Sequence, residues 1–477
     1  MRIWFLFLAT WILLSFIFSN SFAVDSVITT AKEQTNLEVT IYNSNIGLVK
    51  DQRKINFLKG LQELRYMDVA SKIIPESVSI RCLTNSKCMN VFEQNYEYDL
   101  ISPEKLLEKY IGKEVKLYTK NPYTEKEEIV KARVLSNHGY KTVFQIGDEI
   151  TFGHSGRIIF PEMPKNFISK PTLLWLLQTP KEGQQDIEGA YLTEGINWYS
   201  NYVLTLNDKD DMANLTAWVT IINKSGATYM DANLKLVAGD IQRIQRKKDM
   251  YDSRYVMLKS AEAPTMQMTE KEFFEYYIYN LNRKTTLKDN QTKQIVMVEA
   301  SQIPLKKEYV YKETNPFYYT SRYFDTLSNT KVDVFIEFMN SKEHNLGIAL
   351  PKGDVRVYKY DHDKSLQFIG ENSIDHTPKN EKIRFKIGSA FDIKVTRKQT
   401  EWTKLTNNIY ESSYLINLRN HKKEDIVVTV IEKIPGSWKV LNSSLGYKKY
   451  DSGTIHFTVP IKKESEANLT YTVRVEY

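Results

Sequence analysis

Hydrophobic and polar residues alternate along most of this chain with a period of two, the pattern of β-strands that bury one face. Clear examples begin at Leu37, Ala213, Val332 and Leu469. Turn sequences such as Asn223-Lys224-Ser225-Gly226 separate these runs at the short intervals seen in β-sandwiches and barrels. The pattern therefore predicts a mainly β fold, in which Leu234 and Leu236 begin the strand that pairs with the one before this turn.

One helix is predicted at Ser102-Pro103-Glu104, where a cap residue, a proline and an acidic residue follow one another, and it ends at Gly112. Such a helix followed by several short strands is typical of a small closed barrel of the SH3 or Sm kind. The segment Glu270–Asn282 begins with charged residues, but its aromatic residues alternate, so we expect a strand. The strand candidates of the barrel are residues 115–118, 129–135, 142–146, 149–152 and 157–160.

The fold class is thus mainly β, with several sandwich or barrel modules, a small SH3/Sm-like insertion and few helices. We expect a flexible start to the mature chain over residues 24–34. The clearest boundary is expected near Lys398–Thr406, where the last strand of the central block ends. The expected domains are residues 24–102, completed by strands near 164–190 after the insertion, then 103–163, 191–400 and 401–477.

Residues Met1–Ala23 have the three parts of a secretory signal: Arg2, an apolar run to Phe18, and small residues at Ser21 and Ala23. We expect cleavage after Ala23 and a periplasmic or extracellular protein that does not span the membrane. The alternative is an uncleaved N-terminal membrane anchor.

The only cysteines are Cys82 and Cys88. Apolar alternation on both sides places them at the two mouths of a short hairpin, within disulfide range. In an oxidising compartment we expect a bridge, and two reduced thiols are the alternative.

Charge does not favour a nucleic-acid partner. The chain carries 65 Lys and Arg against 58 Asp and Glu. This excess is spread along the sequence, whereas nucleic-acid-binding modules concentrate it. The densest basic run, Arg243–Lys248, is expected to be a solvated loop or strand end.

No known catalytic motif is matched. Gly153-His154-Ser155-Gly156-Arg157 resembles a serine nucleophile elbow, but Arg157 stands where that motif requires glycine. Asp361-His362-Asp363 and Asp208-Lys209-Asp210-Asp211 place carboxylates close together, as calcium or zinc sites do, yet we expect polar hairpin tips. The sequence therefore assigns no catalytic residue, no metal ligand and no cofactor.

Two aromatic groups are candidates for a sugar-binding platform or a partner surface. They are Trp198 with Tyr199 and Tyr202, and the run Phe317-Tyr318-Tyr319. For both groups we expect packing in a core or between neighbouring strands.

A series of segments in the second half of the chain forms a recognisable pattern. They are Tyr191–Tyr202, Asn223–Gly226, Leu234–Gly239, Glu275–Tyr279, Leu287–Lys293, Leu350–Gly353, Phe368–Glu371, His376–Glu381, Gly388–Asp392 and Leu418–His421. Together these segments resemble a bacterial family known as domain of unknown function 4139. Tyr42–Arg53 and Glu93–Asp99 resemble the N-terminal partner region of exported members, and Cys82 and Cys88 are not part of the pattern. The resemblance implies an exported, β-rich bacterial protein, and it transfers no catalytic residue because the family has no agreed activity.

From these patterns we expect a non-enzymatic binding or structural protein of the envelope or periplasm, holding a protein or glycan partner on β-domain surfaces. The alternative is an exported hydrolase with a dispersed carboxylate or metal-assisted site.

Overall fold

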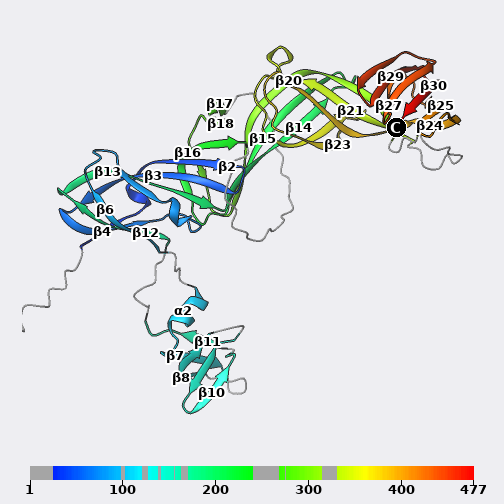
Figure 1. The fold of residues 1–477 in the computed structure, drawn as a ribbon. Coiled ribbons are helices and arrows are strands. Elements are labelled where there is room, and N and C mark those ends of the chain that lie inside the picture. Colours follow the sequence, from blue (N-terminus) through cyan, green and yellow to red (C-terminus); the bar gives the residue numbers. More distant parts are fainter. Residues whose placement is uncertain are drawn as a thin grey trace, which may run out of the picture.

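The computed structural model describes residues 25–97, 102–120, 127–137, 141–154, 156–162, 170–239, 268–273, 276–313, 318 and 330–477 (Figure 1). The predicted export signal, with its cleavage site at Ala23, and the basic run Arg243–Lys248 lie outside these residues. The described chain is mainly β, as predicted, and contains a single α-helix. Within it, no helix is both long and apolar enough to cross a membrane.

The N-terminal part is a sandwich of two sheets with a largely apolar interior. Leu64 and Trp175 of one sheet and Val39 and Ile187 of the other are completely buried between them. The four-stranded sheet has the order β1 (Asp25–Thr29), β4 (Gly60–Met67), β12 (Thr172–Thr179) and β6 (Asn90–Glu97). The second sheet has the order β17 (Met268–Phe273), β18 (Tyr276–Leu281), β16 (Tyr229–Ala238), β2 (Gln34–Tyr42), β3 (Ile46–Phe57), β13 (Gly183–Glu194) and β5 (Ser79–Cys82), with β19 (Thr285–Leu287) beside β16.

The expectation of a flexible start is wrong from Asp25 onward. Strand β1 pairs in parallel with β4, and the 3₁₀ turn η1 (Ala31–Glu33) is closed by a capping box between Thr30 and Glu33. The fully buried guanidinium of Arg53 holds this segment, because it donates to the carbonyl oxygen of Thr29 at 3.1 Å. Its charge is balanced by Asp51 at 2.7 Å.

The structure contains the Cys82–Cys88 disulfide, with the two Cα atoms 6.3 Å apart. The hairpin expected around it is wrong. Cys82 ends β5, which pairs with β13, whereas the strand after Cys88, β6, pairs with β12 in the other sheet. The segment between β4 and β5 contains the turn η2 (Pro75–Ser77). The bridge therefore closes the chain where it passes from one sheet of the sandwich to the other.

Between β6 and β12 lies a small module with its own core. Its helix, α2 (Pro103–Lys109), is capped by Ser102, whose hydroxyl accepts from the amide of Lys105 at 3.2 Å. The apolar cluster around Leu117 and Phe144 draws only on residues 107–160. The predicted helix and all five predicted strands are present. The strands are β7 (Glu114–Lys120), β8 (Glu127–Ser136), β9 (Val143–Ile146), β10 (Glu149–Phe152) and β11 (Arg157–Ile159), in the order β10-β9-β8-β7-β11.

The central part is a strongly curved region of a thirteen-stranded sheet. Its two ends approach each other, since Asn372 in β23 donates to the Lys386 carbonyl of β24 at 2.8 Å. This approach requires glycine at Gly370, where a side chain would collide with the carbonyl oxygen of Ile387. The curved region contains β23 (Leu366–Ile374), β22 (Gly353–Tyr360), β14 (Ile196–Leu206), β15 (Met212–Asn223), β20 (Gln291–Lys312), β21 (Lys331–Met339) and the first half of β24 (Lys382–Lys404); the 3₁₀ turn η4 (Lys342–His344) follows β21.

The pairing expected across Asn223–Gly226 is wrong. Strand β15 pairs with β14 and β20, while β16 crosses to the other sheet and pairs with β2, β18 and β19. The prediction that Glu270–Asn282 is β rather than helical is confirmed. The segment forms two strands, β17 and β18, which pair with each other.

The C-terminal part is a second sandwich around a separate core. Long strands connect the central part to this sandwich. Strand β24 continues without a break through the position of the boundary expected near residue 400. Ile393, in the middle of β24, belongs to the C-terminal core. One layer contains the ends of β20, β26 (Ile426–Lys433), β29 (Thr454–Ile461) and β28 (Tyr447–Asp451); the other contains the second half of β24, β25 (Ile409–Asn420), β30 (Ser465–Glu476) and β27 (Ser437–Ser443).

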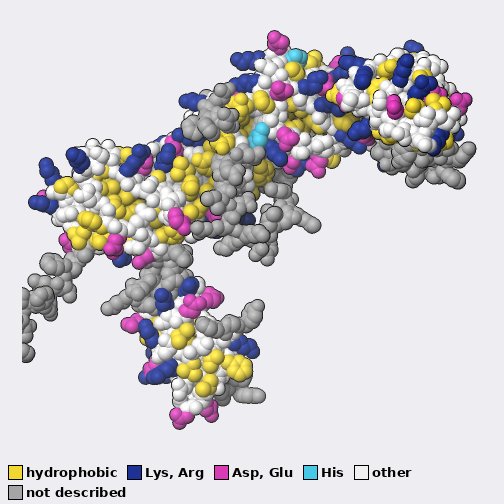
Figure 2. Space-filling view, in the orientation of Figure 1, with side chains coloured by type: hydrophobic (Ala, Val, Ile, Leu, Met, Phe, Trp, Pro, Cys, Tyr) yellow, Lys and Arg dark blue, Asp and Glu magenta, His cyan; other side chains and the backbone are white. Residues whose placement is uncertain are grey.

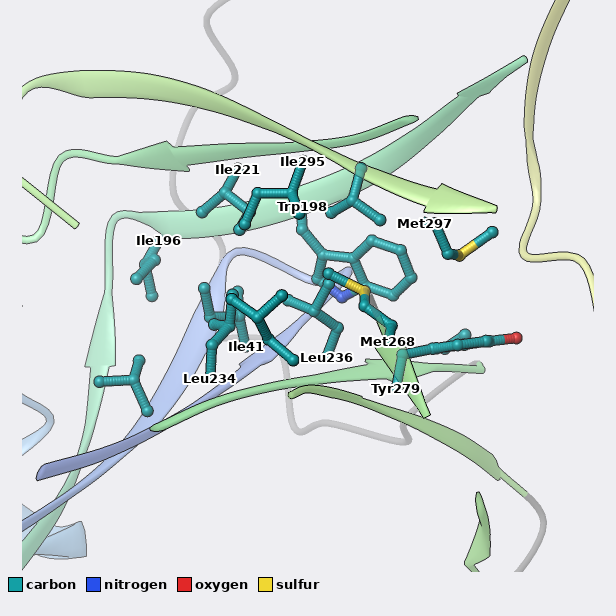
Figure 3. Close-up of a cluster of buried hydrophobic side chains, with 14 of the residues drawn as sticks. Ile41, Ile196, Trp198, Ile221, Leu234, Leu236, Met268, Tyr279, Ile295 and Met297 are labelled. Atoms are coloured by element: carbon teal, nitrogen blue, oxygen red, sulfur yellow. The ribbon is translucent and has the colours of Figure 1, made fainter. Parts of the chain in front are cut away.

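The N-terminal and central parts share one continuous core. Strands β2 and β3 lie between β16 and β13, so the N-terminal segment completes a sheet formed by later strands. Figure 3 shows Ile41 of β2 in the same cluster as Trp198 of β14 and Leu236 of β16. The indole of Trp198 also donates to the Val237 carbonyl at 3.2 Å, which joins the two sheets.

Candidate binding surface

The acidic turns considered as metal sites are hairpin tips. The carboxylate of Asp361 accepts from the side chain of Gln367 and the amide of Ser365, and these hydrogen bonds lower its pKa. Burial alone would raise the pKa of Asp210, but hydrogen bonds from Lys307 and Lys359 lower it. The part of the chain that the structure describes contains no cluster of three His, Cys, Asp or Glu side chains able to hold a metal ion.

The structure describes only part of the Gly153–Arg157 segment that resembles a nucleophile elbow, because Ser155 lies outside the described residues. The neighbouring His154 packs edge-on against Phe144, with ring centroids 6.4 Å apart. Its Nε2 atom is buried without a hydrogen-bond partner among the described residues. No acid or second base is placed beside it in that part of the chain, so the geometry offers no triad.

Three of the aromatic residues considered for a platform, Trp198, Tyr202 and Tyr318, are core residues. Trp198 and Tyr202 are each 1 % exposed, and the hydroxyl of Tyr202 donates to the Pro351 carbonyl at 2.5 Å. Tyr199 is half-buried. Phe317 and Tyr319 lie outside the described residues, and Tyr318 between them is fully buried. Core packing is therefore confirmed for Trp198, Tyr202 and Tyr318.

Tyr318 belongs to a buried, hydrogen-bonded group of titratable side chains in the C-terminal sandwich. Arg397 of β24 and Glu432 of β26 form a buried ion pair at 3.0 Å, and the Tyr318 hydroxyl donates to Glu432 at 2.9 Å. Burial raises the pKa of Tyr318 well above its usual value, so the hydroxyl remains a donor. Every member is enclosed and hydrogen-bonded, so this group joins the two layers of the C-terminal sandwich and offers no access to a substrate.

The inserted barrel presents an exposed apolar surface, here named the hairpin patch: Val143, Ile150 and Phe152 on the β9–β10 hairpin. Ile150 is 69 % exposed and Phe152 is 67 % exposed. Phe152 lies directly opposite Val143, and Ile150 lies on the same face two residues away. The ammonium group of Lys141 lies 5.4 Å from the centre of the Phe152 ring. Figure 2 shows hydrophobic side chains gathered on the surface of this module.

The turn of the hairpin explains why these side chains point outward. Glu149 pairs with Ile146 across the two residues Gly147 and Asp148, so Ile150 shares a face with Gln145, and Phe144 faces the core with Ile146. Because side chains alternate along a strand, the second apolar pair is left on the outer face. The sequence identified the strand but not its exposed face. The two-residue Gly-Asp turn was the signal that could have revealed it.

The fold and this surface together define a modular, mainly β protein in which an independent barrel with an apolar outer face is inserted into a larger interlocked body. The family model described as domain of unknown function (DUF4139) matches residues 187–477, and the chain belongs to this family. The match begins inside β13 and covers the central and C-terminal parts, so the barrel and the N-terminal strands precede it. No curated protein matches the chain.

Proposed function

We propose that this is an exported, non-catalytic binding protein of the bacterial envelope or periplasm, and that its inserted barrel holds a protein partner through the hairpin patch. The observation that carries the proposal is the exposure of Ile150 and Phe152 on a module that the body does not need for its own packing. Exposed apolar patches mark interaction sites, because leaving them in water is unfavourable.

Two further features support this proposal. The N-terminal segment Met1–Ala23 has the composition of an export signal, and the Cys82–Cys88 bridge suits an oxidising compartment. The patch also places the aromatic ring of Phe152 on the same face as the aliphatic side chains of Val143 and Ile150, and aromatic residues are enriched at protein interfaces.

The test is site-specific photocrosslinking in intact cells. A photoreactive amino acid replaces Ile150, and in the matched control it replaces Ile129, which is 59 % exposed on β8 of the same barrel. We expect a discrete crosslinked protein at position 150, absent at position 129 and lost when Phe152→Glu is added. Equal crosslinking at both positions, or a product that persists with Phe152→Glu, would exclude the hairpin patch as the docking surface. Recovery of the chain from the cytosol with Met1 retained would contradict export.

A further inference from the structure

An exposed aromatic pair lies on the layer of the C-terminal sandwich that contains β26, β28 and β29. Tyr450 of β28 is 68 % exposed, and its ring stacks on that of His456 in β29, with centroids 4.7 Å apart and planes 11° from parallel. His456 is partly buried, so it supports the tyrosine ring from one side and leaves the other side in solvent. A ring held in this way loses little conformational freedom when a ligand stacks on it.

A lysine faces this pair across the two strands. Lys448 lies directly opposite His456 in the β28–β29 register. Burial lowers the pKa of His456, and the positive charges of Arg384 and Lys448 lower it further against the opposing effect of Asp451. The ammonium group of the next residue, Lys449, lies 4.8 Å from the centre of the Trp438 ring.

The positive charge at this tip is not neutralised locally. Residues 433–456 contain four lysines and one acidic residue, Asp451. Lys439, Lys448 and Lys449 have no ion-pair partner among the described residues, and the carboxylate of Asp451 is engaged by the amide of Gly453 at 2.8 Å. The surface thus offers the aromatic face of Tyr450 with the ammonium group of Lys448 beside it.

We propose that this surface, Tyr450 with His456 and Lys448, is a binding site for an acidic polysaccharide. The carbon-bound hydrogens on one face of a pyranose ring carry partial positive charge, which the negative face of an aromatic ring attracts. A carboxylate on the same sugar then reaches the ammonium group of Lys448 and forms a charge-assisted hydrogen bond. A neutral glycan leaves the lysines unpaired, and a polyanion without sugar rings leaves the tyrosine face unused. This site is separate from the hairpin patch and does not depend on the function proposed for it.

The experiment measures binding of the full mature chain to oligogalacturonate by calorimetry, with dextran and polyphosphate as comparison ligands. We expect oligogalacturonate to bind and dextran not to bind. Tyr450→Ala should weaken binding about tenfold, as loss of one aromatic contact implies, whereas Tyr450→Phe should bind like the native chain. Lys448→Gln should weaken binding and reduce its dependence on salt.

The matched control is Tyr360→Ala, because Tyr360 is 50 % exposed on β22, away from this tip. It should leave binding unchanged. The proposal is overturned if oligogalacturonate fails to bind, if Tyr450→Ala binds as the native chain does, or if polyphosphate binds equally well and responds to Tyr450→Ala in the same way. Thermal unfolding of each variant separates loss of the site from loss of the fold.

Discussion

The inserted barrel and the strand pair β2–β3 both precede the family region in sequence, yet they relate to the rest of the molecule in opposite ways. The core of the barrel around Leu117 draws only on residues within the insertion. Strands β2 and β3 instead lie between β16 and β13, and their side chains Val39 and Ile41 belong to the largest core cluster.

This difference shows that position relative to a family boundary does not define a structural unit. The strand pair precedes residue 187 but is an internal part of the sheet to which later strands belong. The barrel is an appendage whose removal leaves every sheet of the body complete. The apolar residues of the barrel therefore take no part in the core of the body, whereas those of β2 and β3 are needed for its folding.

The largest expected effect follows from separating the family region from the strand pair. A chain of residues 187–477 lacks β2 and β3, so β16 loses its parallel partner and the cluster around Trp198 loses Ile41. Because a sheet with exposed edges and an open core is unfavourable, we expect the central part of this chain to lose its cooperative unfolding transition and to bind an apolar dye strongly, while the C-terminal sandwich keeps its separate core. The comparison chain is residues 24–477. A sharp thermal transition of the central part in 187–477 would show that the strand pair is dispensable.

Much of this arrangement follows from the sequence, and the parts that do not have a physical reason. Period-two alternation predicted the strands and the mainly β class, because it reports which residues face a core. The alternation does not report which of the cores a strand packs against. The turn at Asn223–Gly226 reads as a hairpin, but Asn223 is buried and its side-chain amide donates to the carbonyl oxygens of Ala227 and Leu287, which guides the chain across to the other sheet. Long-range pairing of this kind leaves no local pattern.

The candidate surfaces were missed for a related reason. Aromatic content drew attention to Trp198 and Tyr202, which are core residues, whereas Tyr450 and Phe152 stand in short strands with ordinary composition. Exposure is decided by register and by neighbouring strands. Only the two-residue turn before Glu149 carried a sequence signal for one of the two surfaces.

A second prediction compares one aromatic residue from each region. Trp198→Ala opens a cavity in the shared core and removes the hydrogen bond to Val237, so we expect the free energy of unfolding of the body to fall by about 3–5 kcal/mol. Phe152→Ala on the barrel surface should change the free energy of unfolding of the body by less than about 0.5 kcal/mol. Urea denaturation followed by tryptophan fluorescence and circular dichroism measures both. Similar losses for the two variants would mean that the hairpin patch is packed against the body.

The disulfide gives a smaller, local effect. It closes the passage between the sheets, from the end of β5 to the loop before β6, and the loop is short. Replacing both cysteines with serine should therefore lower the free energy of unfolding of the body by about 2 kcal/mol, mainly through the entropy of the unfolded chain. Denaturation of oxidised and chemically reduced native chain provides the control. A loss confined to the barrel transition would contradict the placement of the bridge in the sandwich.

The smallest effect is expected from removing the barrel altogether. Glu97 at the end of β6 pairs directly with Thr172 at the start of β12, so the two strands need only a short hairpin turn to remain joined. Replacing residues 98–169 with a turn of about four residues should leave the unfolding free energy of the body within about 0.5 kcal/mol of the native value. On the proposal that the hairpin patch holds a protein partner, the shortened chain should lose that partner while retaining any binding at Tyr450. If the shortened chain instead unfolds at a markedly lower urea concentration, the barrel stabilises the body. The exposed apolar face of the barrel would then contribute to stability, and its exposure would no longer support a role in binding alone.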